Sequence, residues 1–386
     1  TNTSIREGWF YRDDTHQKVR STDDVFDIYE RAVGGNSTFL LNIPPNRDGK
    51  FSPADVAVLK GTGQRIRETY GTDLFRQAEG PKEVLDQNAD TYVTVDKDGP
   101  GIVISTPRPV TLNRLVLQEA IATNGERVEK HAVDAWIDGG WKEIAHSTNI
   151  GYKRILRFPD VTTDKIRVRI LESRLTPAIC TISAHHYKAR PPRLSAQRNM
   201  DGLVTIEPMP QEFGWKAHGE NIAENLNAGF KIYYTTDGTE PSAGSTEYKA
   251  PFLMGNSELK AVAILNGEKG AILQERFGLV KKGWKVIGKT AQFLAIDLGS
   301  EHILSGFAFT PQKQGDKGTV AGIIRISNDG KNWKEMESFE FGNLINDPSK
   351  RYHHYKQMVK ARYIQVEAAE IAARTEADAL AGIDIF

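Results

Sequence analysis

The spacing of hydrophobic positions changes near residue 80 of this chain. Residues 22–33 place apolar side chains at helical spacing, between a capping hydroxyl and two glycines, which predicts a helix. Residues 37–46 hold a short apolar run closed by two prolines, which predicts a buried strand of the parallel kind. Pro53 at a first helical position then predicts a second helix, through residue 70. A helix–strand–helix unit alone cannot bury a parallel strand, so we expect it to belong to a larger sheet.

From about residue 86 onward the period of the pattern falls to two. Apolar and polar side chains alternate in four segments, as in half-buried antiparallel strands, over residues 113–119, 132–137, 153–158 and 165–170. This pattern predicts a β-sandwich.

A second all-β stretch follows the proline-rich joint at residues 190–192 and ends near Gly278. It contains Asp237 and Gly238, a pair that supplies the positive φ that a tight hairpin needs. We therefore expect a β-domain with a short hairpin at this position.

An internal repeat defines the last segment. Residues 133–144 match residues 324–336 as strand, Asp-Gly hairpin, tryptophan and strand, and residues 163–170 match 360–367 at a comparable distance downstream. Two copies of one sandwich are therefore expected to flank a different β-domain.

Composition narrows the possible functions. The 386 residues carry 50 Lys and Arg against 50 Asp and Glu, so the basic excess that nucleic acid would require is missing. No apolar run reaches the roughly 18 residues that a membrane helix needs. The single cysteine, Cys180, excludes an internal disulfide and leaves the compartment open.

Three segments near the N-terminus resemble a known enzyme family. Residues 4–11, 21–29 and 40–49 are similar, in order and spacing, to the end of the catalytic barrel of α-L-fucosidases of glycoside hydrolase family 29. Residues 151–169 resemble the galactose-binding-like sandwich that follows this barrel. Residues 233–241 resemble the immunoglobulin-like domain at the C-terminus of chitobiases, and residues 327–333 resemble a discoidin module of the factor V/VIII type C kind.

The resemblance predicts a multidomain, mostly β protein. The terminal units of a (β/α)8-type barrel would be followed by two galactose-binding-like sandwiches that flank an immunoglobulin-like domain. The expected domains are barrel end, first sandwich, immunoglobulin-like domain and discoidin-like sandwich, over residues 1–75, 76–190, 191–278 and 279–386.

The resemblance also implies an activity: release of fucose from glycans by an exo-acting, retaining α-L-fucosidase. The family's nucleophile and acid/base would lie upstream of Thr1, so we assign no catalytic residue to this chain. The implied partners are fucosylated glycans and the remainder of the barrel, and the implied location is the bacterial periplasm or the exterior. A carbohydrate-binding module array and a structural spacer are the alternative functions.

Four residues are candidates for substrate binding. By resemblance, Trp9 and Phe10 would form an apolar wall for the sugar ring, and Asn42 and Asn46 would contact its hydroxyl groups. The alternatives are a core tryptophan and asparagines that cap the strand end and the turn.

Other features favour structural roles. We expect no metal site and no required cofactor, because the paired histidines at 185–186 and 353–354 point to opposite faces of their strands. The resemblance allows a structural calcium in the sandwich loops, with Asp86, Asp90 and Asp96 as contributors. Three tryptophans could be sugar-stacking platforms, although core positions are the favoured interpretation: Trp136, Trp141 and Trp333.

Overall fold

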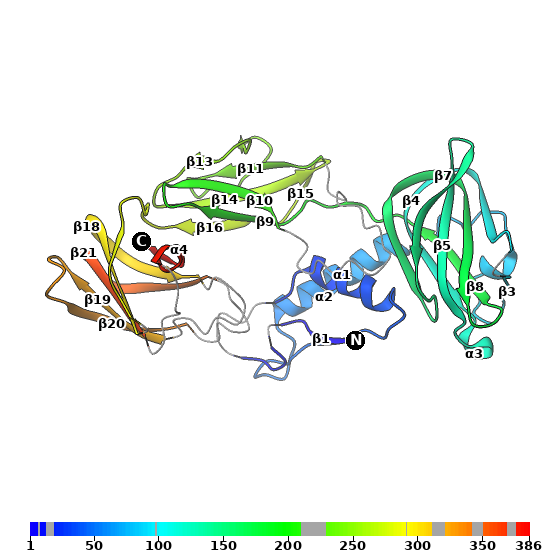
Figure 1. Cartoon of the computed structure of the whole chain (residues 1–386), viewed down its shortest axis with the longest axis horizontal. Coiled ribbons are helices and arrows are strands. Elements are labelled where there is room, and N and C mark those ends of the chain that lie inside the picture. Colours follow the sequence, from blue (N-terminus) through cyan, green and yellow to red (C-terminus); the bar gives the residue numbers. More distant parts are fainter. Residues whose placement is uncertain are drawn as a thin grey trace. The chain divides into compact units, whose positions relative to one another are not determined.

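The computed structural model describes residues 1–6, 8–12, 19–96, 99–209, 229–290, 292–310, 321–341, 350–368 and 376–386. The chain divides into two compact units (Figure 1), the first built mainly from Thr1–Tyr11 and Val19–Ala189 and the second from Arg190–Met209 and Gly229–Phe386. The structure is mostly antiparallel β-sheet with few helices. No helix in the described ranges is both long and apolar enough to cross a membrane.

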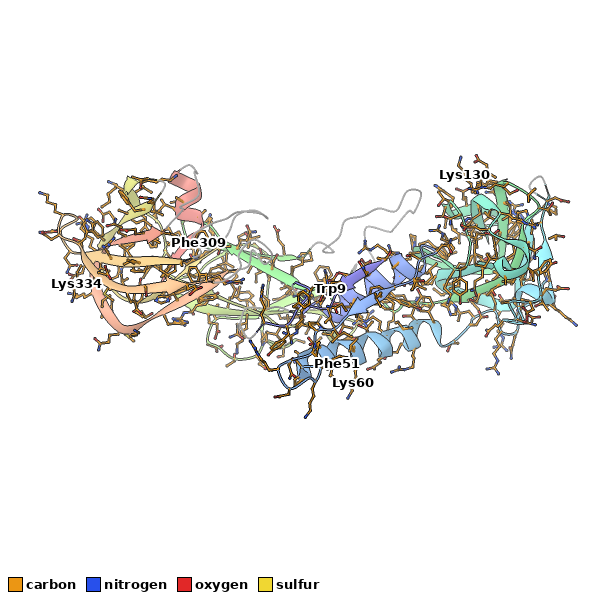
Figure 2. The ribbon with its side chains drawn as sticks, turned by 90° about the horizontal axis from the view of Figure 1, so that it is seen from below. Trp9, Phe51, Lys60, Lys130, Phe309 and Lys334 are labelled. Carbon is orange, nitrogen blue, oxygen red and sulfur yellow. The ribbon has the colours of Figure 1, made fainter. Side chains whose placement is uncertain are left out.

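The N-terminal segment forms the predicted helix, strand and helix: α1 (Thr22–Val33), β2 (Leu40–Asn42) and α2 (Pro53–Tyr70). The hydroxyl of Ser21 accepts a hydrogen bond from the Asp24 amide at 3.2 Å, which caps α1. The two helices lie side by side in both views (Figure 1 and Figure 2), and Gly61 allows this approach, since a Cβ there would come within 2.7 Å of the Thr22 hydroxyl.

Strand β2 pairs in parallel with β1 (Asn2–Ser4), as its sequence predicted, but its expected burial is wrong. Leu40 is 59% exposed. A parallel strand is buried only when neighbours and covering layers protect both faces, and β1 is its one partner strand among the described residues.

The first unit also holds a six-stranded antiparallel sheet in the order β3-β8-β4-β7-β5-β6. Its long strands β4 and β7 each change register within the pairing, so that they bend around one apolar core. The strands are β3 (Val93–Thr94), β4 (Ile102–Glu119), β5 (Val128–Ile137), β6 (Gly140–Ser147), β7 (Arg154–Ser173) and β8 (Ala178–His185). Two short helical turns accompany them, η1 (Lys82–Val84) and α3 (Ile121–Asn124).

The hairpin between β5 and β6 has the predicted tight turn. Ile137 pairs with Gly140, and the two residues between them, Asp138 and Gly139, have φ values of 52° and 79°. Positive φ at both positions defines a type I′ turn, whose twist matches that of the flanking strands.

The second unit begins with two small sheets on a shared core. One has the order β13-β10-β9, and the other has the order β12-β11-β14-β15 with β16 beside β14. The strands are β9 (Leu194–Arg198), β10 (Leu203–Pro208), β11 (Lys231–Thr235), β12 (Thr246–Glu247), β13 (Phe252–Leu253), β14 (Ser257–Leu265), β15 (Glu268–Lys269) and β16 (Leu273–Phe277).

The tight hairpin expected at Asp237 and Gly238 is wrong. Strand β11 ends at Thr235 and β12 begins only at Thr246, so a long loop joins them. Gly238 has φ 83°, whereas the Asp237 carboxylate accepts hydrogen bonds from the amide and hydroxyl of Thr239. Asp237 thus supports a local turn inside the loop rather than a two-residue connection.

The last sheet has the order β17-β18-β21-β19-β20, with β22 also beside β18. The run β22-β18-β21-β19-β20 repeats the run β8-β4-β7-β5-β6 of the first unit, so the internal repeat of the sequence corresponds to one strand order. The four-domain division stays a prediction. The elements are β17 (Lys285–Lys289), β18 (Phe293–Phe309), β19 (Ala321–Ser327), β20 (Lys334–Glu340), β21 (Arg351–Ala368), α4 (Glu376–Ala381) and β22 (Ile383–Ile385).

A buried ion pair joins α1 to the first six-stranded sheet. Arg114 on β4 donates to both carboxylate oxygens of Glu30 at 2.6 and 3.1 Å, and each side chain is 2% exposed. The Tyr70 hydroxyl donates to the same carboxylate at 2.5 Å, and Arg157 binds Asp27 at 2.8 Å. Glu30 and Arg114 lie 84 positions apart in the sequence, so no local pattern specifies their pairing.

The segment that connects α2 to this sheet is also fixed. The Leu74 amide donates to the Ala184 carbonyl at 2.8 Å, and His185 contacts the Thr72 carbonyl through Nδ1 at 2.7 Å. Phe75 is 2% exposed and belongs to the sheet's core. Both apolar side chains expected to be buried at this joint pack against the core, Phe75 fully buried and Leu74 half-buried.

Charged side chains also join the two parts of the second unit. Lys350 binds Glu275 and Asp384, both at 2.7 Å, and Lys281 binds Asp384 at 3.1 Å. Glu275 lies on β16 and Asp384 on β22, so this network connects the smaller sheets to the last one.

Electrostatics keep Glu30 ionised. Burial raises the pKa of Glu30, but Arg114, Arg157 and the Tyr70 hydroxyl outweigh it, and the pKa is lowered from its ordinary value of 4.5. Burial and the neighbouring Glu30 charge raise the pKa of Tyr70 well above its usual range, so its hydroxyl remains a donor. The pair therefore carries full charge at neutral pH.

Glu30→Gln should destabilise the first unit by about 3–5 kcal/mol at pH 7, because it leaves the Arg114 charge buried without a counter-charge. Urea unfolding measures this loss. Because the pKa of Glu30 is lowered from 4.5 on folding, ionised Glu30 stabilises the fold above pH 4.5. This stabilisation is lost as the pH falls through the folded-state pKa. The difference in unfolding free energy between wild type and variant should therefore shrink in acid. Glu172→Gln, which breaks the exposed pair with Lys130, is the control and should cost about 0–1 kcal/mol. Equal losses for the two variants would contradict the role given to the buried pair.

Trypsin should cut after Lys188 before it cuts after Arg76. Both side chains are exposed, but the backbone around Arg76 is fixed by the buried Phe75 and by hydrogen bonds, whereas Lys188 lies just ahead of the prolines that connect the two units. Mass spectrometry of early digests identifies the order. Release of the six-stranded sheet by a first cut at Arg76 would show that the joint is open.

Candidate functional site

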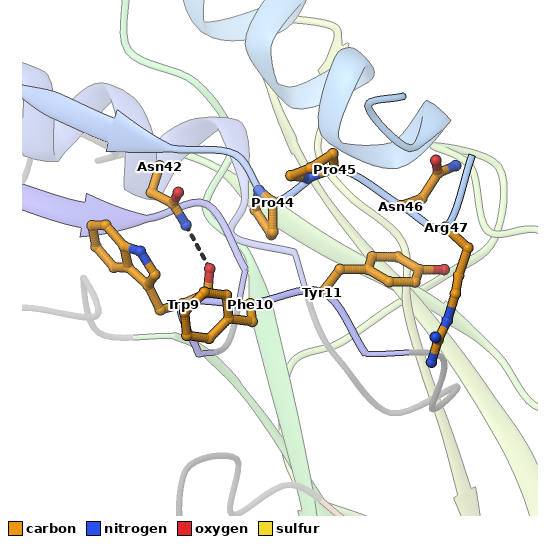
Figure 3. A pocket seen from close by; sticks show the side chains of 8 residues that line it. All are labelled: Trp9, Phe10, Tyr11, Asn42, Pro44, Pro45, Asn46 and Arg47. Carbon is orange, nitrogen blue, oxygen red and sulfur yellow. Dashed lines mark hydrogen bonds between the residues drawn. The ribbon is translucent and has the colours of Figure 1, made fainter. Parts of the chain in front are cut away.

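A hollow of about 510 Å³ lies where β2 ends, beside the segment that follows β1 (Figure 3). All four predicted substrate-binding residues line it. The lining residues are Trp9, Phe10, Tyr11, Asn42, Pro44, Pro45, Asn46 and Arg47. Parallel strands of α/β folds carry their ligand sites at their carboxyl ends, and Asn42 is the last residue of β2.

Asn42 holds the aromatic segment in place. Its Nδ2 donates to the Trp9 carbonyl at 2.8 Å and to the Ser4 hydroxyl at 3.2 Å. Ser4 lies directly opposite Asn42 in the strand pairing, so the amide is positioned by the sheet itself. Asn42 therefore positions the backbone of Trp9, and a contact between its amide and a sugar stays a prediction.

Trp9 and Phe10 form the apolar part of the hollow. They are 45% and 79% exposed, so Trp9 does not occupy the core position that was its alternative interpretation. Figure 3 shows both rings on the strand side, next to the Asn42 amide. Exposed aromatic faces of this kind suit a ligand with C–H bonds on one face.

Asn46 stabilises the turn that follows β2. Its Oδ1 accepts hydrogen bonds from the amides of Asp48 and Lys50, both at 3.0 Å. This is the capping role that was the alternative to sugar binding. A contact between Asn46 and substrate stays a prediction.

Sequence reasoning missed four lining residues: Tyr11, Pro44, Pro45 and Arg47. Tyr11 packs under the Arg6 guanidinium, 5.6 Å from the ring centroid, and Arg6 in turn binds the buried Asp55 on α2. The signal was present in the two prolines, which turn the chain so that Arg47 reaches the same hollow.

The described lining of the hollow lacks the acidic side chains that glycoside hydrolysis uses. Of its lining residues that the structure describes, none carries a carboxyl group. Retaining glycoside hydrolysis needs two carboxyl groups about 5–5.5 Å apart. What this chain supplies is a wall and a positioning amide.

The described residues contain no group of three or more His, Cys, Asp or Glu side chains that could hold a metal. The Asp86 carboxylate accepts hydrogen bonds from the Thr91 hydroxyl and the Asn88 amide, so it stabilises its own loop. Calcium binding by Asp86, Asp90 and Asp96 stays a prediction.

A second hollow, of about 360 Å³, lies at one end of the six-stranded sheet. Its lining is polar: Glu126, Val128, Glu129, Thr148, Asn149 and Arg174. Glu126 accepts hydrogen bonds from Asn36 and Asn149 at 3.0 and 2.5 Å, so its carboxylate ties α1's following loop to the sheet. The Asn36 side chain, part of a glycosylation sequon, is thereby engaged within the fold.

Two segments match known protein families. Residues 1–70 match the alpha-L-fucosidase family model, and residues 222–277 match a model described as Fn3 associated. Among curated proteins, alpha-L-fucosidase 1 of Arabidopsis thaliana is 28% identical over 197 residues, which cover 46% of this chain and 38% of the relative. The chain therefore spans less than half the length of this relative.

Solved structures give related matches. A family 29 fucosidase of Ruminococcus gnavus in complex with fucose is 25% identical, with a TM-score of 0.43. The match covers 48% of this chain and 40% of the fucosidase chain. A glycoside hydrolase 29 family member from an unknown rumen bacterium is 22% identical, with a TM-score of 0.42. That match covers 100% of this chain and 54% of the rumen protein's chain.

Asn42→Ala should speed amide hydrogen exchange across residues 8–12 by about tenfold, because the hydrogen bond that holds the Trp9 carbonyl is lost. Asn42→Asp should speed it further, since a carboxylate oxygen would face the Trp9 carbonyl. Mass spectrometry of exchange in the whole chain measures both. Asn124→Ala, which removes a side-chain amide that donates to the neighbouring Thr123 hydroxyl, is the control. Unchanged exchange in Asn42→Asp would refute the positioning role.

Proposed function

We propose that this chain, a relative of the α-L-fucosidases of glycoside hydrolase family 29, is the C-terminal portion of an exo-acting enzyme that releases fucose from glycans. One observation carries the proposal. Within the segment that matches the family model, an exposed Trp9 is held by Asn42 at the carboxyl end of a parallel strand. Fucosylated glycans are then the substrates.

In this proposal the chain binds sugar and the rest of the barrel performs the chemistry. Trp9 and Phe10 cover one face of the fucose ring and its methyl group, and Asn42 sets their position. The nucleophile and the acid/base come from the remainder of a (β/α)8 barrel, which would pair with the β1–β2 sheet and cover Leu40.

The remaining domains are proposed to be accessory. The shared strand order supports assigning the two six-stranded sheets to one galactose-binding-like type, the second of them discoidin-like, with an immunoglobulin-like domain between them. A periplasmic or secreted location and a structural calcium follow from the resemblance alone.

A bracing role for the first sandwich has its own support. The buried Glu30–Arg114 pair fastens this sheet to α1, and the joint after α2 is closed by Phe75. The sandwich would therefore hold the end of the barrel in place, which is compatible with sugar release by the intact enzyme.

Trp9→Ala should lower kcat/KM of the intact enzyme for a nitrophenyl α-L-fucoside by about tenfold to a hundredfold, because the ring contacts ligand rather than core. Its melting temperature should stay near that of wild type. Phe51→Ala, which removes a 52% exposed ring outside the hollow, is the matched control and should retain activity (Figure 2).

The purified 386-residue chain alone should not turn over this substrate. Turnover by the chain would overturn the division of labour proposed here. An unaltered kcat/KM in folded Trp9→Ala would overturn the sugar-wall role.

A further inference from the structure

Trp136 and Trp141 of the first six-stranded sheet lie outside its core. The sequence had favoured core positions for both. Val133 and Ala135 on β5 are fully buried in the core. Side chains alternate along a strand, so Asp134 and Trp136 point to the opposite face. Trp141 on β6 is paired with Trp136 and shares that face. Both indoles are half-buried rather than enclosed.

The two rings form a preorganised pair. Their centroids are 5.3 Å apart with an interplanar angle of 78°, an edge-to-face arrangement. The type I′ turn at Asp138 and Gly139 fixes the hairpin directly beside them. A ligand that contacts this pair would therefore order little of the protein on binding.

Charged groups continue this face across β7. The Arg167 guanidinium lies 4.7 Å from the Trp141 ring centroid, and the Lys165 ammonium lies 5.7 Å from that of Trp136. Asp134 accepts hydrogen bonds from Arg167 at 2.8 Å and from Arg169 at 2.7 Å. Asp134 is 2% exposed and both its oxygens accept from these arginines, so it holds the guanidinium groups in place beside the indoles.

We propose that this face, made of Trp136, Trp141, Arg167 and Lys165, is a glycan-binding platform. A pyranose ring has a face of C–H bonds, which suits an indole, and a rim of hydroxyl groups that both donate and accept hydrogen bonds. The platform offers these features side by side on a rigid sheet. Asp134 and Glu143 bind Arg167 and Arg169, so the net charge of this part of the sheet is small, which favours a neutral glycan over a nucleic acid or an anionic surface.

The second copy of the repeat provides an internal comparison. Ser327 occupies the position equivalent to Trp136, while Trp333 is equivalent to Trp141, so the second copy has no indole pair. Arg325 takes the place of Asp134 and binds Glu367 and Glu335, which keeps a charge network on the same strands. The ion network is thus common to both copies, whereas the tryptophan pair distinguishes the first. Because the second copy keeps its ion network without an indole pair, covering that network does not explain why the first copy has two tryptophans.

This platform is separate from the hollow at Trp9 and does not depend on the proposed enzyme activity. The test is native affinity electrophoresis of the full chain through gels that contain fucosylated mucin. Wild type should be retarded, and Trp136→Ala and Trp141→Ala should each weaken the apparent affinity by about fivefold to tenfold. Trp136→Phe, which keeps an aromatic face, should retain most of the retardation.

Two controls separate the sites. Trp333→Ala and Phe51→Ala should each change the retardation less than twofold, and mucin stripped of its glycans should not retard the chain. Equal weakening by Trp136→Ala and Trp333→Ala, retardation by stripped mucin, loss of binding only in Trp9→Ala, or no retardation of wild type would overturn the platform. Melting curves confirm that each variant is folded.

Discussion

The buried pair between Glu30 and Arg114 determines how the first unit is built. Removing two charges from water costs several kcal/mol per ion, so such a pair forms only where geometry and further hydrogen bonds offset that cost. Here the guanidinium meets the carboxylate through two hydrogen bonds, and Tyr70 satisfies the carboxylate from the second helix. A hydrophobic contact of equal area would tolerate sliding of α1 over β4, whereas this arrangement has one register. The sheet and the strand that carries the hollow are consequently fixed relative to each other within this unit.

The second unit uses the same principle with less burial. Lys350 bridges Glu275 and Asp384, which lie on different sheets, and Lys281 shares Asp384 from the connecting segment. Charged side chains at such joints must be matched in number and position, because one unpaired member would remain desolvated. Each unit therefore consists of two neighbouring segments fastened by ionic contacts, while proline-rich residues 190–192 connect one unit to the next.

Local patterns predicted the elements, and tertiary contacts decided their environment. Capping and spacing identified α1 and α2, and the Asp138–Gly139 turn followed from its sequence because both residues accept positive φ. The same dipeptide at Asp237 failed, since its carboxylate binds Thr239 within a longer loop. The misplaced tryptophans could have been assigned from the sequence: alternation from the small apolar Val133 and Ala135 already places Trp136 on the other face. The Glu30–Arg114 pair could not, because nothing local links positions so far apart.

The hollow at the end of β2 was likewise predicted from the sequence only in part. Trp9 and Asn42 were predicted by resemblance, but the amide's bond to the Trp9 carbonyl depends on the pairing of β2 with β1. Loop residues such as Tyr11 and Arg47 were missed because their place is set by the double proline and by Arg6, not by any periodicity. The aromatic segment is thus held by strand pairing and one side-chain amide, and the described lining of the hollow includes no carboxyl group. Strand pairing therefore sets the geometry of the hollow, whereas buried ion pairs set that of the unit around it.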